Sequence, residues 1–311
     1  MSGFVPWDSQ SLEDWARQHA RGTTIDLAGH RTHYIEKGEG PPLILLHGFF
    51  YDSYLWAENI DALSRHFKVY ALDLWGCGYS TREPMEYGYA LYAEQLRLFM
   101  DAMGLSRASI AGQSMGAGTA IKFCVQHRDR VDRLVLVDAA AMPNPLPAMA
   151  KFFNLPGLGE FLLTRKTDLF RRTALKDVFI HDASKITDDY YDNVTRAHKI
   201  RGSVAVGFRI QRADFFDKLS DEVRALGSLD VPVLLVWGRE DKAIPLRCAQ
   251  QMYALLPGSR LEILDKAGHV SNFEQADAFN RLAIDFLRAS ASPSNRAVEA
   301  TADRGNPMPV A

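Results

Sequence analysis

The segment best suited to chemistry is Ala108–Gly118, in which a serine stands between two glycines as Gly112-x-Ser114-x-Gly116. An apolar run precedes the serine and a helix-compatible segment follows it, which predicts a tight turn from a strand into a helix. A Cβ at either glycine would obstruct the close approach of strand and helix. Ser114 would then be an exposed nucleophile at a helix start, where free N–H groups favour negative charge. The alternative is an ordinary strand-to-helix turn that happens to contain a serine.

The overall composition favours an ordinary globular protein and excludes several classes of partner. The 311 residues are 47% hydrophobic and 24% charged, with a formal net charge of −2. This balance gives no reason to expect a nucleic acid or an anionic membrane as partner. No apolar run approaches the roughly 20 residues that span a bilayer, and the first residues lack the features of a signal peptide. We therefore expect a cytoplasmic protein without a stable membrane anchor. No motif specifies an oligomeric state.

The elements that must position Ser114 alternate between apolar strands and helices. Continuous apolar runs predict buried strands at Pro42–Leu46, Val69–Leu72, Arg133–Val137 and Val231–Trp237. Helical spacing predicts helices at Tyr89–Met103, at about 246–256 and near the end of the chain. This alternation predicts a parallel sheet with helices on both faces. Sites in such sheets lie at the carboxyl ends of the strands, and the residues that follow predicted strands are Phe49, Ser114, Asp138, Asp241 and His269.

Three further segments complete the predicted organisation. Thr23–Leu27 and Thr32–Glu36 read as an antiparallel hairpin, in which His30 and His33 lie on opposite faces and are interpreted as surface residues rather than metal ligands. Residues 140–227 contain only helix-like pieces and are too long for a loop, so they predict a helical cap inserted over the site. The core is then 1–139 and 228–289, and 290–311 is expected to be disordered because it lacks apolar periodicity.

The cysteines give no sign of a disulfide or a metal site. The chain has three, far apart along the sequence and without paired spacing. Cys77 lies between Gly76 and Gly78 in a loop, and these neighbours explain an exposed thiol without a redox role. We expect neither a metal nor a cofactor.

Five motifs, taken together, resemble the α/β-hydrolase fold superfamily, and more narrowly its serine esterase and lipase-like members with a helical cap. The match extends from about Thr23 to Leu287 and rests on these motifs: His47-Gly48-Phe49, Asp73-x-x-Gly76-x-Gly78-x-Ser80, Gly112-x-Ser114-x-Gly116, Gly238-x-x-Asp241 and Gly268-His269. The order of nucleophile, acid and histidine is also that of the superfamily. The resemblance implies a mostly parallel eight-stranded sheet with helices on both faces.

The same resemblance implies a role for each motif residue. Ser114 resembles the nucleophile and His269 the general base, and a serine hydroxyl needs such a base within hydrogen-bond reach. Asp241 resembles the acid that orients the histidine, while Asp138 occupies a position that some relatives use instead. The backbone N–H groups of Phe49 and Met115 resemble the oxyanion donors. His47 is interpreted as a support for its loop rather than as a catalyst.

These roles predict hydrolysis of a small-molecule carboxylic ester through an acyl-enzyme, with a hydrophobic, medium-chain or aromatic acyl group. A serine nucleophile argues against dehalogenases and epoxide hydrolases of this fold, which attack with a carboxylate. Enzymes that hydrolyse carbon–carbon bonds of ring-fission products also resemble the chain. They usually carry asparagine before the serine and a glycine-rich loop after His-Gly, where this chain has Gln113 and Phe49-Phe50. A slow-turnover ligand-sensing protein is a further alternative, from a different functional class.

Overall fold

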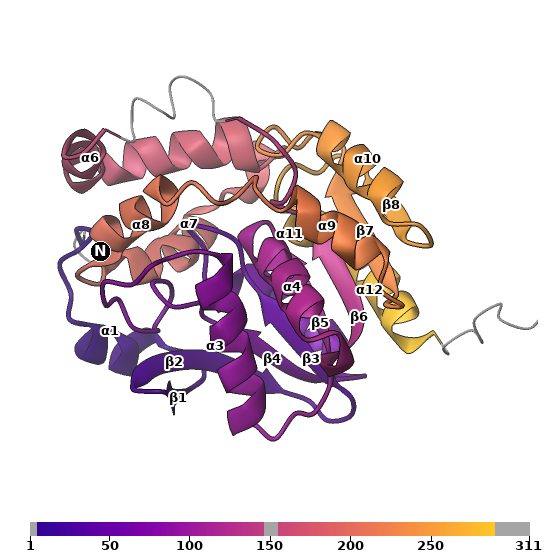
Figure 1. Ribbon diagram of the computed structural model, residues 1–311. Helices are drawn as coiled ribbons and strands as arrows, with labels where there is room; N and C mark the ends of the chain where they lie inside the picture. Colours follow the sequence, from indigo (N-terminus) through magenta and orange to yellow (C-terminus); the bar gives the residue numbers. More distant parts are fainter. Residues whose placement is uncertain (1–4, 146–154, 290–311) are drawn as a thin grey trace, which may run out of the picture.

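The fold is built on one eight-stranded sheet (Figure 1). The computed structural model describes residues 5–145 and 155–289, without the side chains of 162–168 and 170. The strand order is β1-β2-β4-β3-β5-β6-β7-β8. β2 pairs antiparallel with both β1 and β4, and all the other pairs are parallel, so the predicted mostly parallel eight-stranded sheet is confirmed. The strands are β1 Thr23–Leu27, β2 His30–Lys37, β3 Pro42–Leu46, β4 Lys68–Leu72, β5 Ala108–Gln113, β6 Val131–Val137, β7 Val233–Gly238 and β8 Arg260–Leu264.

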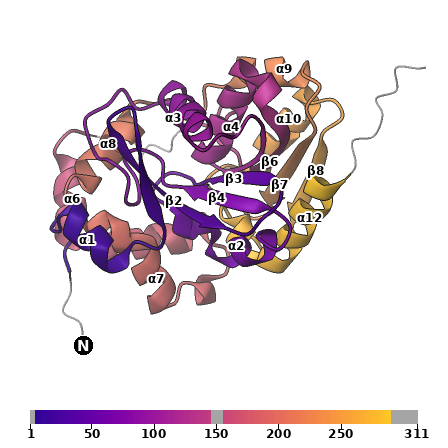
Figure 2. The same ribbon diagram turned by 90° about the horizontal axis from the view of Figure 1, so that it is seen from below.

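Helices cover both faces of this sheet (Figure 2). Alternate residues of each apolar strand point to opposite faces of the sheet. Ile44 and Leu46 therefore belong to one buried cluster, and Leu43 and Leu45 belong to the other. The first cluster is covered by α3 Tyr89–Ala102, α4 Met115–Gln126, α9 Ser220–Gly227 and α10 Leu246–Leu255. The second is covered by α2 Ala57–Leu63 and α12 Ala276–Arg288. Strands buried on both faces explain their continuous apolar sequences.

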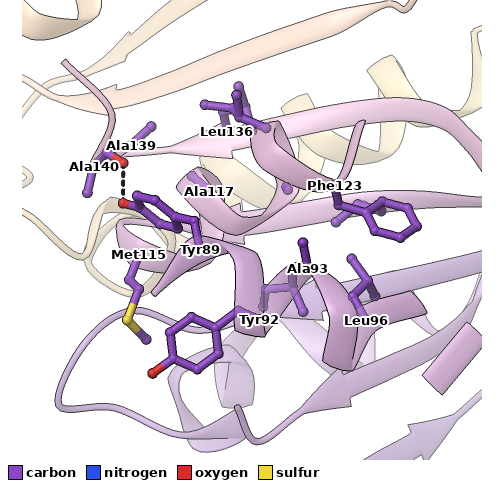
Figure 3. Close-up of a cluster of buried hydrophobic side chains, with 14 of the residues drawn as sticks. Tyr89, Tyr92, Ala93, Leu96, Met115, Ala117, Phe123, Leu136, Ala139 and Ala140 are labelled. Carbon is purple, nitrogen blue, oxygen red and sulfur yellow. Dashed lines mark hydrogen bonds between the residues drawn. The ribbon is translucent and has the colours of Figure 1, made fainter. Parts of the chain in front are cut away.

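The packing of α3 against α4 fixes the start of α4, the helix that follows the predicted nucleophile (Figure 3). The Tyr89 ring lies across Gly118, where an added Cβ would come within 2.3 Å of the ring. The Tyr89 hydroxyl donates a hydrogen bond of 2.6 Å to the Ala140 carbonyl. The same aromatic side chain therefore ties α3, α4 and the loop after β6 together.

An insertion of helices lies between β6 and β7. Its described elements are α6 Leu158–Ala174, the π-helical turn η3 Leu175–Phe179, the short turn η4 Ala183–Lys185, α7 Asp188–Thr195, η5 Arg196–Lys199, α8 Ser203–Arg212 and α9. Where residues 139–227 are described, they form no strand, as the sequence predicted. We refer to 155–227 as the insertion, since the boundaries 140–227 of a separate cap domain remain a prediction. Residues 146–154 and the predicted tail 290–311 lie outside the described ranges.

The remaining elements are short and lie near the N-terminus or beside the sheet. Helix α1 Leu12–His19 is capped by Ser11, whose side chain accepts from the Asp14 N–H. The other short helices are η1 Ser53–Trp56, η2 Arg128–Arg130 and α11 Ser271–Glu274. Within the described ranges, no helix combines the length and apolar character needed to cross a membrane.

Two sequence-based interpretations are wrong, because both residues concerned are buried. His33 is 1% exposed and donates from Nδ1 to the Asp73 carboxylate at 2.7 Å, so it is an interior residue and not a surface residue of the hairpin. The loop after β4 folds over this face of β2, an arrangement that the alternating pattern of the hairpin does not reveal. Cys77 is also buried rather than exposed, and burial raises the pKa of its thiol to about 12.

Candidate functional site

Ser114 stands at a strained turn between β5 and α4. Its φ and ψ are 52° and −114°, in a region that non-glycine residues rarely adopt. A Cβ on Gly112 would lie 2.4 Å from the Gly116 carbonyl group, and one on Gly116 would lie 2.2 Å from the Leu46 oxygen. Both glycines are therefore required for the close approach that the sequence predicted. The turn places the Ser114 hydroxyl beyond the carboxyl end of the central strands.

The structure brings Ser114, His269 and Asp241 into one hydrogen-bonded chain. His269 Nε2 lies 3.0 Å from Ser114 Oγ, and His269 Nδ1 lies 2.8 Å from Asp241 Oδ2. The second oxygen of Asp241 accepts from the N–H groups of Ala243 and Ile244, both at 2.8 Å, which fixes the carboxylate. Because the carboxylate can only accept, His269 donates from Nδ1, and its Nε2 is then free to accept the Ser114 proton.

Burial and charge act in opposite directions on His269. Burial lowers the pKa of the imidazole, but the charge and hydrogen bond of Asp241, together with the more distant Asp138, outweigh it and raise the pKa above the ordinary value. The imidazolium form that arises when His269 takes a proton is therefore stabilised. This is the electrostatic arrangement required of a general base that must carry a proton briefly.

Asp138, the alternative acid, does not contact the His269 ring. Its two oxygens accept from the N–H groups of Gly238, at 2.8 Å, and Ser271, at 3.1 Å. Burial, together with the neighbouring Asp241, raises the pKa of Asp138 to about 7. The structure therefore places Asp241, and not Asp138, on the far nitrogen of the histidine, while Asp138 joins the loop after β7 to the segment that follows His269.

The two predicted oxyanion donors belong to segments next to the nucleophile, since a Cβ added to Gly48 would lie 3.1 Å from Ser114 Cβ. Met115 is the first residue of α4, and Phe49 lies in the turn that follows β3. His47 supports this turn: its Nδ1 donates to the Gly48 carbonyl at 2.8 Å, and its Nε2 accepts from the Leu74 N–H at 2.9 Å. Burial lowers the pKa of His47, which favours the neutral form that can make both bonds. These contacts are those of a supporting residue.

Sequence reasoning missed the groups that hold the His269 loop. The Gln113 side-chain amide donates to the His269 carbonyl at 2.6 Å, and the His269 N–H donates to the Phe179 carbonyl of the insertion at 2.7 Å. Glu274 is 2% exposed, and its carboxylate accepts from the N–H groups of Gly268, His181 and Asp182. No motif marks these residues, because their role depends on backbone partners that are distant in sequence.

The site offers no evident place for a metal ion. Among the residues that the structure describes, no group of three or more histidine, cysteine, aspartate or glutamate side chains is arranged to hold one.

Comparisons with known proteins agree with this geometry. The sequence model of the alpha/beta hydrolase fold family matches residues 41–276. The 2-hydroxymuconate semialdehyde hydrolase of Pseudomonas putida is 30% identical over 272 residues, which cover 86% of this chain and 94% of that protein. The 2-hydroxy-6-oxo-6-phenylhexa-2,4-dienoate hydrolase of Comamonas testosteroni is 29% identical over 276 residues, or 85% of this chain and 93% of that protein. A solved meta-cleavage product hydrolase (CumD) from Pseudomonas fluorescens IP01 superposes with a TM-score of 0.73 at 30% identity, covering 86% and 97% of the two chains.

The fold and the site thus define an α/β hydrolase. The chain belongs to the α/β-hydrolase fold family and is a hydrolase.

Proposed function

We propose that the protein is a serine hydrolase that cleaves a carbon–carbon bond next to a ketone, in substrates of the meta-cleavage product type. The observation that carries the proposal is the contact between Ser114 Oγ and His269 Nε2 at 3.0 Å, with Asp241 on the other nitrogen. The relatives support the choice of bond, because the three proteins reported above are named as hydrolases of such products. Ester hydrolysis, the first expectation from the sequence, becomes the second candidate.

The proposed reaction begins with attack by Ser114 on the ketone carbon. The Ser114 proton passes to His269 as the new C–O bond forms, and the ketone oxygen takes the negative charge. The N–H groups of Met115 and Phe49 stabilise this oxyanion. The tetrahedral intermediate then collapses and the carbon–carbon bond breaks. The leaving carbon receives the proton from His269. Water, activated by His269, then hydrolyses the acyl-enzyme and restores the serine hydroxyl.

Carbon is a much poorer leaving group than an alkoxide, so the substrate itself must accept the electrons. A 2-hydroxy-6-oxo-dienoate, the kind of compound in one relative's name, can do so after tautomerisation, in which the 2-hydroxyl group loses its proton and C5 gains one. The resulting 2-oxo group is conjugated through the C3=C4 double bond with C5 and accepts the electrons of the broken C5–C6 bond. An ester needs no such system. Ester hydrolysis remains a candidate because Phe49 and Phe216, with ring centroids 5.3 Å apart, make the surroundings of the turn apolar. Gln113 and Phe49-Phe50 also depart from the usual pattern of the carbon–carbon hydrolases.

The test compares the two substrate classes on the same preparation. We expect kcat/KM for 2-hydroxy-6-oxo-6-phenylhexa-2,4-dienoate to exceed that for p-nitrophenyl butyrate by at least about tenfold, a difference of about 1.4 kcal/mol in transition-state binding. Decay of the dienoate absorbance and release of p-nitrophenol measure the two rates. Ser114→Ala should lower both rates by about 10⁴-fold or more. Faster turnover of the ester would make the protein an esterase, and full activity of Ser114→Ala would contradict the mechanism for either substrate.

A further inference from the structure

The turn Gly48–Tyr51, which carries the proposed oxyanion donor Phe49, is strained. The Tyr51 N–H donates to the Gly48 carbonyl at 3.3 Å and closes a four-residue turn. Phe50, the third residue, has a φ of +60°, where such turns normally require glycine. A non-glycine residue in this conformation is strained, and it persists only where the surroundings determine it. The contacts that hold Phe50 are therefore important for the site.

Those contacts come from the insertion. Arg171 of α6 donates from Nη2 to the Phe50 carbonyl at 3.0 Å, and its Cζ lies 5.7 Å from the Phe50 ring centroid and 5.2 Å from that of Tyr51. The Phe50 ring packs against Gly207 of α8, where an added Cβ would lie 3.1 Å from the ring. The His198 ring meets it edge-on at 5.6 Å. Both the carbonyl and the ring of Phe50 are thus held by helices outside the sheet core.

Arg171 is unusual because it is buried without a carboxylate. It is 5% exposed, no ion pair is found for it among the described residues, and its Nε has no hydrogen-bond partner there. A guanidinium is charged at every accessible pH, and burying it is costly unless it is compensated. The contacts that compensate it include the Phe50 carbonyl, the faces of Phe50, Tyr51 and Phe179, and the Tyr51 hydroxyl.

We propose that Arg171 is a positioning residue for the oxyanion site. By binding the Phe50 carbonyl, it holds the turn in its strained form and keeps the Phe49 N–H directed at the developing oxyanion. The proposal rests on the proposed function, in which the Phe49 N–H is one of the two donors. Docking of the insertion then completes the catalytic site, because the same segment also binds the His269 loop through the Phe179 carbonyl.

A positioning role affects the transition state more than the bound substrate, and this gives the test. Arg171→Met should lower kcat by about 10- to 100-fold with little change in KM, because a donor displaced by about 1 Å loses a comparable factor. The loss should be equal for p-nitrophenyl butyrate and for p-nitrophenyl hemisuccinate, which adds a carboxylate. Arg172→Met is the matched control, since its guanidinium contacts Asp188 and Tyr191 instead.

Two inhibitors distinguish a loss of oxyanion-donor positioning from a general distortion of the active site. Ser114 adds to the carbonyl carbon of a phenylalkyl trifluoromethyl ketone, its proton moves to His269, and the ketone oxygen becomes an oxyanion. The corresponding secondary alcohol binds without forming one. Arg171→Met should lower the affinity for the ketone by the same factor as kcat/KM and leave the affinity for the alcohol unchanged. Equal weakening of both inhibitors, or a loss confined to the hemisuccinate, would overturn the proposal.

Further variants cover the case in which Arg171→Met folds poorly. Arg171→Lys retains a charge and a donor, so it should recover part of kcat. Gly207→Ala reaches the same turn from the side of the Phe50 ring, at a helical position where alanine is favoured, and should show the same selective loss of kcat and of ketone affinity. Unchanged kinetics in both variants would refute the positioning role. If Ser114→Ala retained activity, the proposed function would fail instead, so the two failures are distinguishable.

Discussion

At the scale of single residues, two buried aspartates near one histidine differ in their partners. Asp241 accepts from the His269 ring and from two backbone N–H groups, whereas Asp138 accepts only from backbone N–H groups. The acid is therefore distinguished by geometry rather than by residue type. The sequence alone left both aspartates as candidates because both follow strands that end at the same edge of the sheet.

This difference predicts distinct kinetics for the two amide variants. Asp241→Asn should lower kcat by about 10⁴-fold, because His269 would no longer be held in the required tautomer. Asp138→Asn leaves the Ser114–His269–Asp241 contacts in place and should cost far less. Steady-state kinetics of both variants on one substrate provide the measurement, and near-normal turnover of Asp241→Asn would disprove the assignment of the acid.

The pH dependence of kcat/KM tests the pairing of Asp241 with His269 independently. His269 must be neutral to accept the Ser114 proton, so kcat/KM rises with pH through the pKa of the free enzyme's histidine. Because Asp241 raises the pKa of His269, the wild-type midpoint should lie above pH 6.5. Asp241→Asn removes that charge, and the residual activity should then have its midpoint at lower pH.

At the scale of elements, the strand–turn–helix unit β5–α4 is the least tolerant of added volume. Gly112→Ala places a methyl group 2.4 Å from the Gly116 backbone, where no flexible side chain can move aside. We expect a loss of roughly 1–3 kcal/mol in unfolding free energy, as for other overpacked interiors, together with a large loss of activity as Ser114 shifts. Urea denaturation and kinetics measure the two effects.

The matched control for that variant is Gly88→Ala, at the start of α3. An added Cβ there meets nothing within 4 Å, and the backbone is extended, with φ at 170°. It should change the unfolding free energy by less than about 1 kcal/mol and leave turnover unaltered. Equal effects of the two substitutions would show that steric crowding at Gly112 is not the cause.

Most of the strands and helices that position the site could be predicted, because their patterns are local. The apolar runs at Pro42–Leu46 and Arg133–Val137 correspond to β3 and to most of β6, and the spacing over Tyr89–Met103 corresponds to α3. The buried state of His33 could not be predicted, because it depends on a loop from another part of the chain. The same holds for Arg171 and Glu274, whose partners are backbone groups brought near only by the tertiary fold.

At the scale of the whole molecule, a second buried cluster links the N-terminal hairpin to the core. Asp73 accepts from His33 and from the N–H groups of Ser53 and Tyr79. Burial raises the pKa of Asp73, but the His33 charge and hydrogen bond outweigh this and lower it to about 2. Burial, together with Asp73, raises the pKa of Asp52 to about 7. Between about pH 2 and pH 7, the folded protein therefore favours an ionised Asp73 beside a protonated Asp52.

The raised pKa of Asp52 predicts that Asp52→Asn increases the unfolding free energy, and that the increase depends on pH. In the unfolded chain Asp52 ionises near pH 4, so a folded pKa of about 7 makes its contribution to stability fall as pH rises from about 4 to 7. Asparagine can still accept from the Tyr54 N–H and carries no charge. The variant should therefore gain more unfolding free energy over wild type at about pH 8 than at about pH 4, by on the order of 1–3 kcal/mol.

The control for this prediction is Asp61→Asn, whose carboxylate is exposed and paired with Lys37 at the surface. Its effect should be small at both pH values, because exposed pairs contribute little. Urea titrations at the two pH values give the comparison. A gain from Asp52→Asn that did not vary with pH would rule out ionisation of Asp52 as its origin.

Because all three cysteines are buried, alkylation of their thiols can report when the structure around each of them opens. Burial raises the pKa of Cys77 to about 12 and that of Cys124 to about 11, and it also raises that of Cys248. Alkylating reagents attack the thiolate, so modification has to wait for each thiol to be uncovered. The three lie in the loop after β4, in α4 and in α10. All three belong to the buried cluster on one face of the sheet, so the order in which they are alkylated records which of these three segments opens first.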